Sequence, residues 1–148
     1  MKDRKRYVFD TNVIVSALLF KQSTPGQAFH TALDHGSILI SWPILKELVE
    51  VLNRKKFDRY LLQEEKECFL DTLVQETILI EITEHVSICR DPKDNKFLEL
   101  AISGDAACIV SGDNDLLDIG YFRGTPIIKP DKFLVSLIAG TFEQNERY

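Results

Sequence analysis

The chain has 148 residues, 45% of them hydrophobic, and a formal net charge of −5. This length predicts one domain with a single core, because a chain of this size buries roughly 70% of the surface that it exposes when unfolded. No apolar run approaches the ~20 residues that cross a membrane, and the first residues lack the apolar core of a signal peptide, so we expect a cytoplasmic protein without membrane contact. The acidic balance argues against a protein that coats nucleic acid by electrostatics alone.

The order of the apolar segments predicts an α/β fold. Short β-branched runs alternate with longer segments of helical period, a pattern typical of βαβ units and a mainly parallel sheet. In chain order we expect strands at residues 6–10, 37–41, 77–82, 107–111 and 126–129. The expected helical segments cover residues 12–19, 24–35, 43–53, 57–62, 64–75, 94–103 and 132–138. Residues 1–139 then form a single domain, and residues 140–148 form a loose tail.

The cysteines and the basic residues do not by themselves predict a functional site. The three cysteines, Cys68, Cys89 and Cys108, form an odd set without the spacing of a zinc site, so we interpret them as buried thiols. For two basic clusters we favour a solvated surface over a path for phosphate groups. These clusters consist of Lys2, Arg4, Lys5 and Arg6, and of Arg54, Lys55, Lys56 and Arg59.

Four acidic residues are expected at one edge of the sheet. Asp10 ends the first strand, and Asp113 follows the fourth strand within the segment 111–115. Asp94 opens the helix before the fourth strand, and Glu47 lies in the first turns of the helix after the second. Ligands of open parallel sheets bind outside the carboxyl ends of the strands, so we expect these four side chains to converge there.

A divalent cation would stabilise such a cluster. Carboxylates packed together destabilise one another's ionised form, and hard cations such as magnesium or manganese prefer carboxylate and water oxygens. Each acid also has a structural explanation, since Asp10 and Asp94 can cap helices, and Asp113 and Asp115 can occupy a turn. The shared position of the acids beside hydrophobic strands favours a metal site.

At these residues the chain resembles the PIN-domain family, in particular the bacterial PIN proteins identified as toxins of toxin–antitoxin pairs. The resemblance covers nearly the whole chain, and four motifs in this order are far more specific than the opening Phe-Asp-Thr-Asn alone. The matching pieces are Val8-Phe9-Asp10-Thr11-Asn12-Val13, Glu47 after Ser41-Trp42-Pro43, Arg90-Asp91-Pro92-Lys93-Asp94-Asn95-Lys96, and Ser111-Gly112-Asp113-Asn114-Asp115-Leu116.

The resemblance implies a three-layer α/β/α sandwich with a five-stranded, mainly parallel sheet, and a magnesium or manganese site that cleaves RNA. By this likeness Asp10, Glu47, Asp94 and Asp113 are the catalytic and metal-binding acids. The expected mechanism is phosphodiester hydrolysis, in which one cation activates a water and a second stabilises the leaving oxygen. The number of cations is left open.

The same resemblance suggests supporting residues. Asp115 would assist or replace Asp113, while Asp91 is a weaker candidate than Asp94. Hydrogen bonds from Thr11, Asn12 and Ser111 would support the acids. Three basic residues lie near the expected site by motif position only, and these are Lys93, Lys96 and Arg123.

Partners are also implied by the resemblance. We expect an RNA substrate, an antitoxin encoded beside the gene, and a homodimer. Apolar residues that would contribute to a dimer interface, although core burial explains them as well, are Val51, Leu52, Phe57, Tyr60, Leu61 and Leu62.

Three other functions share part of this pattern. Asp10, Ser41 and Asp113 follow strands as in haloacid-dehalogenase-type phosphatases, but Asn12 stands where that chemistry needs a second acid. A phospho-receiver domain lacks its expected aspartate after the third strand. A non-catalytic PIN-like binding module would not require all four acids, which favours an enzyme.

Overall fold

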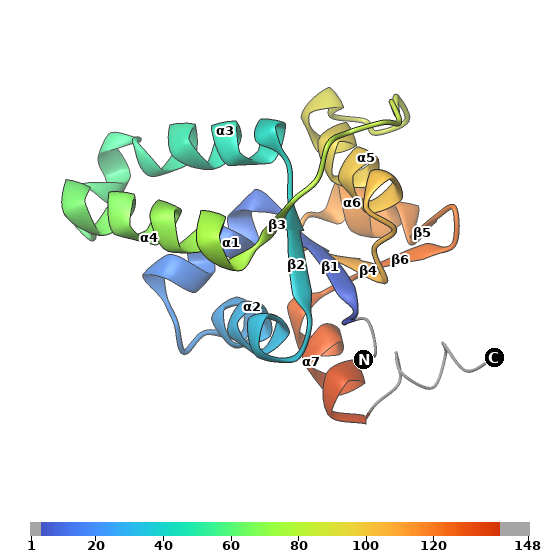
Figure 1. Ribbon diagram of the computed structural model, residues 1–148, viewed down its shortest axis with the longest axis horizontal. Coiled ribbons are helices and arrows are strands. Elements are labelled where there is room, and N and C mark those ends of the chain that lie inside the picture. Colours follow the sequence, from blue (N-terminus) through green and yellow to red (C-terminus); the bar gives the residue numbers. More distant parts are fainter. Residues whose placement is uncertain (1–3, 140–148) are drawn as a thin grey trace.

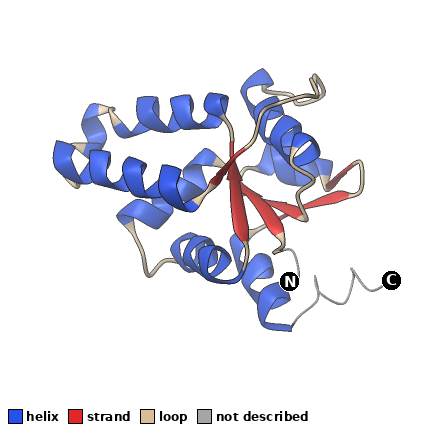
Figure 2. Ribbon diagram, viewed as in Figure 1, coloured by secondary structure: helices blue, strands red, loops and turns tan. Residues whose placement is uncertain are grey.

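The chain folds into a six-stranded sheet with helices on both faces in the computed structural model, which describes residues 4–139 (Figures 1 and 2). The strands are β1 (Arg6–Phe9), β2 (Ser37–Ile40), β3 (Ile78–Leu79), β4 (Cys108–Val110), β5 (Tyr121–Phe122) and β6 (Thr125–Ile128). The α-helices are α1 (Thr11–Leu19), α2 (Thr24–His35), α3 (Trp42–Leu52), α4 (Gln63–Glu76), α5 (Asn95–Ser103), α6 (Asn114–Ile119) and α7 (Pro130–Ala139). Short 3₁₀ helices are η1 (Lys55–Phe57) and η2 (Pro92–Asp94).

The sheet order β3-β2-β1-β4-β6-β5 places β1 between two parallel neighbours, β2 and β4. All pairings are parallel except that of β5 with β6 at one edge. Residues 7–9 of β1 and the whole of β4 are buried, as parallel strands covered on both faces should be. The carboxyl ends of β1, β2 and β4 therefore lie at one edge, from which α1, α3 and the segment before α6 begin.

Four aromatic rings hold two helices on one face of the sheet. Tyr7 and Phe9, two positions apart on β1, project to the same face. Phe133 of α7 makes edge-to-face contacts with Tyr7 at 4.9 Å and with Phe9 at 5.6 Å between ring centroids. Phe29 of α2 makes a similar contact with Phe9 at 5.4 Å. Helix α5 packs on β1, β2 and β4, so the sheet is a middle layer between helices, as the resemblance implied.

The sheet has six strands rather than the expected five, because β5 and β6 form a hairpin. Arg123 and Gly124 in its turn both have positive φ, 49° and 86°, as the two central residues of a tight hairpin turn require. Strand β5 has only two residues, Tyr121 and Phe122, which is too short to show the alternation of a strand. The hairpin was therefore missed in the sequence.

Other differences concern element lengths. Residues 77–82 were expected to form a strand, but only Ile78–Leu79 pairs with β2. The short helix α6, Asn114–Ile119, was not expected, since six residues are too few to establish a helical period. The expected helical piece 57–62 is replaced by η1 and a turn. Helix α7 begins at Pro130, two residues earlier than expected, with proline in a first-turn position.

Of the three cysteines, only Cys108 is a buried thiol. Burial raises the pKa of Cys108 strongly, whereas Cys68 is exposed and Cys89 is half-buried. All three are free, in keeping with the absence of a disulfide framework. Within residues 4–139, no helix combines the length and the apolar character needed to cross a membrane. The expected tail, residues 140–148, lies outside the described residues.

Candidate metal-binding active site

Asp10 links the sheet to α1. Its backbone N–H donates to the carbonyl of Val110 at 3.0 Å, which extends the β1–β4 pairing by one residue. One oxygen of its carboxylate accepts from the backbone N–H of Val13 at 2.8 Å and so caps α1. The other oxygen accepts from the hydroxyl of Ser111. Asp10 therefore caps α1, as its structural explanation predicted, and its side chain is buried, with 3% exposed.

Ser111, just beyond β4, joins two of the predicted acids. Its buried hydroxyl donates to Asp10 and accepts from the backbone N–H of Asp113 at 2.9 Å. Burial raises the pKa of the Asp10 carboxyl, and the charge of Asp113 acts in the same direction. The hydrogen bonds from Ser111 and Val13 oppose this shift. Two chain segments 101 positions apart are therefore connected through one hydroxyl at the sheet edge.

Three carboxylates form a compact cluster beside this pair. One oxygen from each of Asp94, Asp113 and Asp115 lies within 4.8 Å of the others. Asp113 caps α6 by accepting from the backbone N–H of Asp115 at 3.2 Å, while Asp94 ends η2. Burial raises the pKa of Asp94 to about 7, helped by the neighbouring Asp113 and by Asp91, while Lys96 acts in the opposite direction. The charge repulsion in this cluster is what a cation would remove.

Glu47 does not belong to that cluster and has partners of its own. The hydroxyl of Thr11 donates to one oxygen of Glu47, and the Lys96 ammonium lies 2.8 Å from the other. Lys96 itself is largely buried, so this ion pair is shielded from solvent. Helix α3 places Glu47 in its second turn, and α5 places Lys96 in its first. Glu47 is therefore charge-neutralised by a largely buried partner, whereas the ion pair of Asp115 in the cluster, with Arg90, is exposed.

A cavity of about 210 Å³, which we call the acidic cavity, brings the predicted acids together. Its lining residues are Asp10, Thr11, Asn12, Glu47, Val51, Arg54, Asp91, Lys93, Asp94, Phe97 and Asp113. All four predicted acids thus face one space. A second, more open cavity of about 810 Å³ shares Asn12 and Asp113 with it and is also lined by Asp115 and Lys129. Asp113 stands between the two cavities.

The donor set suits a hard divalent cation. The clustered groups are carboxylates, whose oxygens are the ligands that magnesium and manganese prefer. Cys89 lies close by, but burial and the aspartates Asp94 and Asp113 raise the pKa of its thiol to about 11. Its sulfur is not among the clustered ligand atoms, and Cys89 lines neither cavity. The ligand chemistry is oxygen alone, which fits the expected metal.

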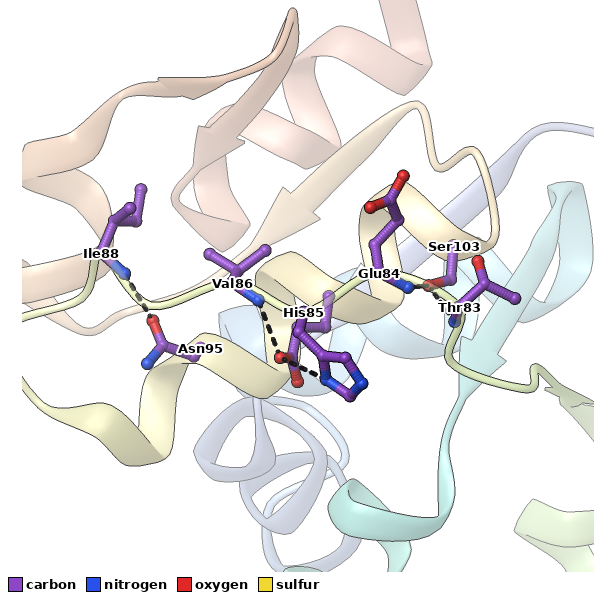
Figure 3. Close-up of polar contacts among 8 residues, drawn as sticks. Thr83, Glu84, His85, Val86, Ile88, Asn95 and Ser103 are labelled. Atoms are coloured by element: carbon purple, nitrogen blue, oxygen red, sulfur yellow. Dashed lines mark hydrogen bonds and ion pairs between the residues drawn. The ribbon is translucent and has the colours of Figure 1, made fainter.

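The loop before Asp91 is positioned by α5, a feature that the sequence did not reveal (Figure 3). Asn95 accepts from the backbone N–H groups of Ile88 at 3.2 Å and Cys89 at 2.9 Å. Glu99 accepts from the N–H of Val86 at 2.9 Å, and Ser103 from that of Thr83 at 3.0 Å. Asn95, Glu99 and Ser103 follow one another every four residues and so share one face of α5. Their hydrogen bonds replace strand pairing as the support for the loop that leads into η2.

Several basic residues surround the acids. Arg54, which was assigned to a solvated surface, lines the acidic cavity together with Lys93. Arg90 forms an exposed ion pair with Asp115 at 3.4 Å. Arg123 lies in the β5–β6 turn, over the ring of Phe122, and is not among the lining residues of either cavity. In the sequence, Arg54 was noted only as a member of the basic cluster of residues 54–59.

This parallel sheet, with acids gathered where β1 and β4 end, defines an α/β protein of PIN-like architecture. A profile of the PIN domain matches residues 6–115. The uncharacterized protein MJ1680 of Methanocaldococcus jannaschii is 30% identical over 120 residues, 80% of this chain and 77% of that protein. The chain belongs to the PIN domain family.

Solved structures share the fold at low sequence identity. VapBC2 from Rickettsia felis, bound to a DNA fragment from its promoter, aligns with a TM-score of 0.59 and 17% identity, over 84% of this chain and 98% of that one. PAE2754 from Pyrobaculum aerophilum aligns with a TM-score of 0.60 and 16% identity, over 91% and 90% of the two chains. The agreement extends the family assignment to the three-dimensional fold.

Proposed function

We propose that the protein is a divalent-metal-dependent ribonuclease that hydrolyses RNA phosphodiester bonds. The observation that carries the proposal is the group formed by Asp94, Asp113 and Asp115, whose oxygens lie within 4.8 Å of one another beside the cavity that Asp10 and Glu47 also line. Uncompensated carboxylates at this spacing are unfavourable, and a bound cation offsets their repulsion. Membership of the PIN domain family supports the same chemistry.

Asp94, Asp113 and Asp115 would hold the cation, and Asp10 lines the same cavity as Asp94 and Asp113. When bound, magnesium or manganese supplies Lewis-acid activation of water and stabilises charge on the phosphodiester. Ser111 fixes the orientation of Asp10 through its hydroxyl. Lys93 and Arg54 line the same cavity and provide positive charge for the phosphate group of a substrate. Lys96 neutralises Glu47, so part of the negative charge is already balanced by the chain.

Asn12 argues against a phosphatase of the haloacid-dehalogenase type. It lines both cavities, at the position where that mechanism needs a carboxylic acid to protonate the leaving group. A neutral amide cannot transfer that proton. The smaller cavity is lined by all four predicted acids, which a non-catalytic binding module does not need.

A cleavage assay tests the proposal. We expect the purified chain to cut a generic single-stranded RNA in manganese, to stop when a chelator is added, and to release no phosphate from p-nitrophenyl phosphate. Phosphate release without RNA cleavage would establish the phosphatase alternative instead. Failure on both substrates, with the protein folded and manganese bound, would leave the binding module.

Manganese should stabilise the folded chain. A cation that binds only the folded state adds about 2.7 kcal/mol to the free energy of unfolding at a hundred times its dissociation constant. We expect manganese to raise the melting temperature of the native protein, and Asp94→Asn to lose most of this rise. The control is Asp118→Asn, which removes an exposed acid of α6 outside the cluster. Equal rises in both variants would place the cation elsewhere.

We further propose that the protein is a toxin paired with an antitoxin encoded beside it, and that it forms a homodimer. The fold shared with VapBC2 supports the first proposal. For the dimer, Val51, Leu52 and Phe57 are buried in the core, whereas Tyr60 and Leu62 are exposed. Leu62, which lines none of the cavities, is therefore the residue of the predicted interface that we assign to the contact. Light scattering of the protein, alone and expressed with its neighbouring gene, measures both assemblies.

A further inference from the structure

An aromatic and basic pocket lies outside the acidic cavity. It has a volume of about 610 Å³, within the range of small-ligand sites, and is formed where the end of α1 meets η1 and the turn after it. We call it the aromatic–basic pocket and define it by Phe20, Lys55, Lys56, Phe57, Arg59 and Tyr60. The mechanism proposed above uses none of these residues.

Two of its rings are presented to solvent. Phe20 is 56% exposed and Tyr60 is 58% exposed, although both line a concave surface. Phe57 is buried in the core, with the ammonium of Lys56 5.1 Å from its ring centroid. Exposed aromatic rings in a hollow offer flat faces on which other planar groups can stack, and the core gains little from them.

The pocket is positively charged in a chain of net charge −5. Its lining includes Lys55, Lys56 and Arg59 and no carboxylate. The nearby Asp58 lies 2.8 Å from the ammonium of Lys66, which is only 3% exposed, so its charge is already paired. Within residues 4–139, no ion pair engages Lys55 or Arg59. These cations are therefore available to an anionic ligand.

Two helices connect the pocket to the acidic cavity. Helix α1 runs from its N-cap Asp10 to its C-cap Phe20, a separation of about 15 Å along the helix axis. Helix α3 carries Glu47 and, one turn later, Val51, which lines the acidic cavity with Arg54. The next residue, Lys55, already lines the pocket. Figure 1 shows α1 and α3 leaving the same edge of the sheet in a similar direction.

We propose that this pocket is a substrate subsite for single-stranded RNA, in which a base stacks on Phe20 or Tyr60 while Lys55 and Arg59 contact phosphates. The proposal rests on the ribonuclease function and deepens it, since the base bound here would lie a few nucleotides from the phosphodiester at the acids. Stacking rings with adjacent cations, one of which directly follows a residue of the acidic cavity in the chain, match the way proteins bind single strands. A duplex would keep its bases paired and would not offer their faces.

The test measures binding and cleavage separately. Binding of an end-labelled single-stranded oligouridylate is followed by fluorescence anisotropy with manganese, in a background of Asp10→Asn so that the strand is not cut. We expect Phe20→Ala and Tyr60→Ala each to weaken binding about tenfold. Lys55→Gln should lower the slope of log affinity against log salt by about 0.7, the value for one phosphate contact on a single strand.

The matched control is Tyr121→Ala, which removes a ring that is 71% exposed on β5 and lines neither cavity nor pocket. Cleavage in the native background provides the second readout. Phe20→Ala and Tyr60→Ala should lower kcat/KM on the oligonucleotide about tenfold, yet leave the rate on the dinucleotide UpU unchanged, since UpU is too short to reach the pocket.

The possible outcomes distinguish failure of the subsite proposal from failure of the ribonuclease proposal. If Phe20→Ala and Tyr60→Ala bind the oligonucleotide as tightly as Tyr121→Ala does, the subsite is wrong and the ribonuclease stands. If they retain RNA affinity but lose a protein that copurifies with the native chain, the pocket docks a protein, which also overturns the proposal. If the native chain neither binds nor cleaves RNA, the proposed function fails and the subsite fails with it.

Discussion

Asp10→Asn should lower metal-dependent RNA cleavage by a factor of about a hundred or more while the chain stays folded. Mutation of residues that only hydrogen-bond to the ligands of a metal lowers metal affinity or activity by about 10–100-fold. Asp10 is a carboxylate that lines the acidic cavity itself, so its effect should be at least as large. The amide keeps the shape of the side chain and removes its charge. Its oxygen can still accept from the N–H of Val13, so the cap of α1 is retained.

The stability of this variant provides the check. Burial raises the pKa of Asp10, which means that the ionised form is disfavoured where it stands. A neutral amide removes that penalty, so the melting temperature without metal should equal or exceed that of the native chain. Asp118→Asn, an exposed change on α6, should alter neither rate nor stability. An undiminished cleavage rate in Asp10→Asn would remove Asp10 from the site.

Phe133→Ala should lower the free energy of unfolding by about 3–5 kcal/mol, the usual effect of deleting a buried aromatic ring. Phe133 is fully buried and contacts the rings of Tyr7 and Phe9 edge to face. Truncation leaves a cavity between α7 and β1 and removes both ring contacts. Chemical denaturation followed by circular dichroism measures the change.

The comparison is with Val135→Ala on the same helix, whose side chain is 66% exposed and should be nearly neutral. Phe133 packs against Phe9, which directly precedes Asp10, so a shift of Phe9 in Phe133→Ala is a route by which this substitution reaches the acidic cavity. Cleavage per folded molecule should nevertheless persist, since Asp10 is fixed by Ser111 and Val13 rather than by the aromatic rings. If fully folded Phe133→Ala cleaves RNA much more slowly than the native chain, the aromatic rings of the core also position Asp10, which contradicts this expectation.

The position of two acids could be predicted from the sequence. Asp10 and Asp113 directly follow hydrophobic strands, and the residues that follow neighbouring parallel strands lie at the same edge of the sheet. The pattern of apolar and polar residues was therefore sufficient to predict that these two acids lie close together. Glu47 and Asp94 depend on where helices begin, which strand patterns do not determine. Their expected place rested mostly on the family resemblance, and the structure puts both at the same cavity.

The arrangement within the site could not be predicted. Nothing in the spacing shows that Asp115 lies within 4.8 Å of Asp94 and Asp113, or that Lys96 neutralises Glu47, since both depend on helix orientations fixed by packing. The β5–β6 hairpin was hidden for a related reason. Its turn relies on positive φ at Arg123, a residue type without a preference for that conformation.

The hydroxyl of Ser111 reaches Asp10 across 101 positions, and this spacing has a consequence during synthesis. A ribosome releases β1 long before β4, so an emerging chain carries Asp10 without its hydrogen-bond partner and without Asp113. Domains complete their long-range contacts only once the later strands are free. The acids therefore assemble after nearly the whole domain has left the exit tunnel, and an unfinished chain carries no complete site.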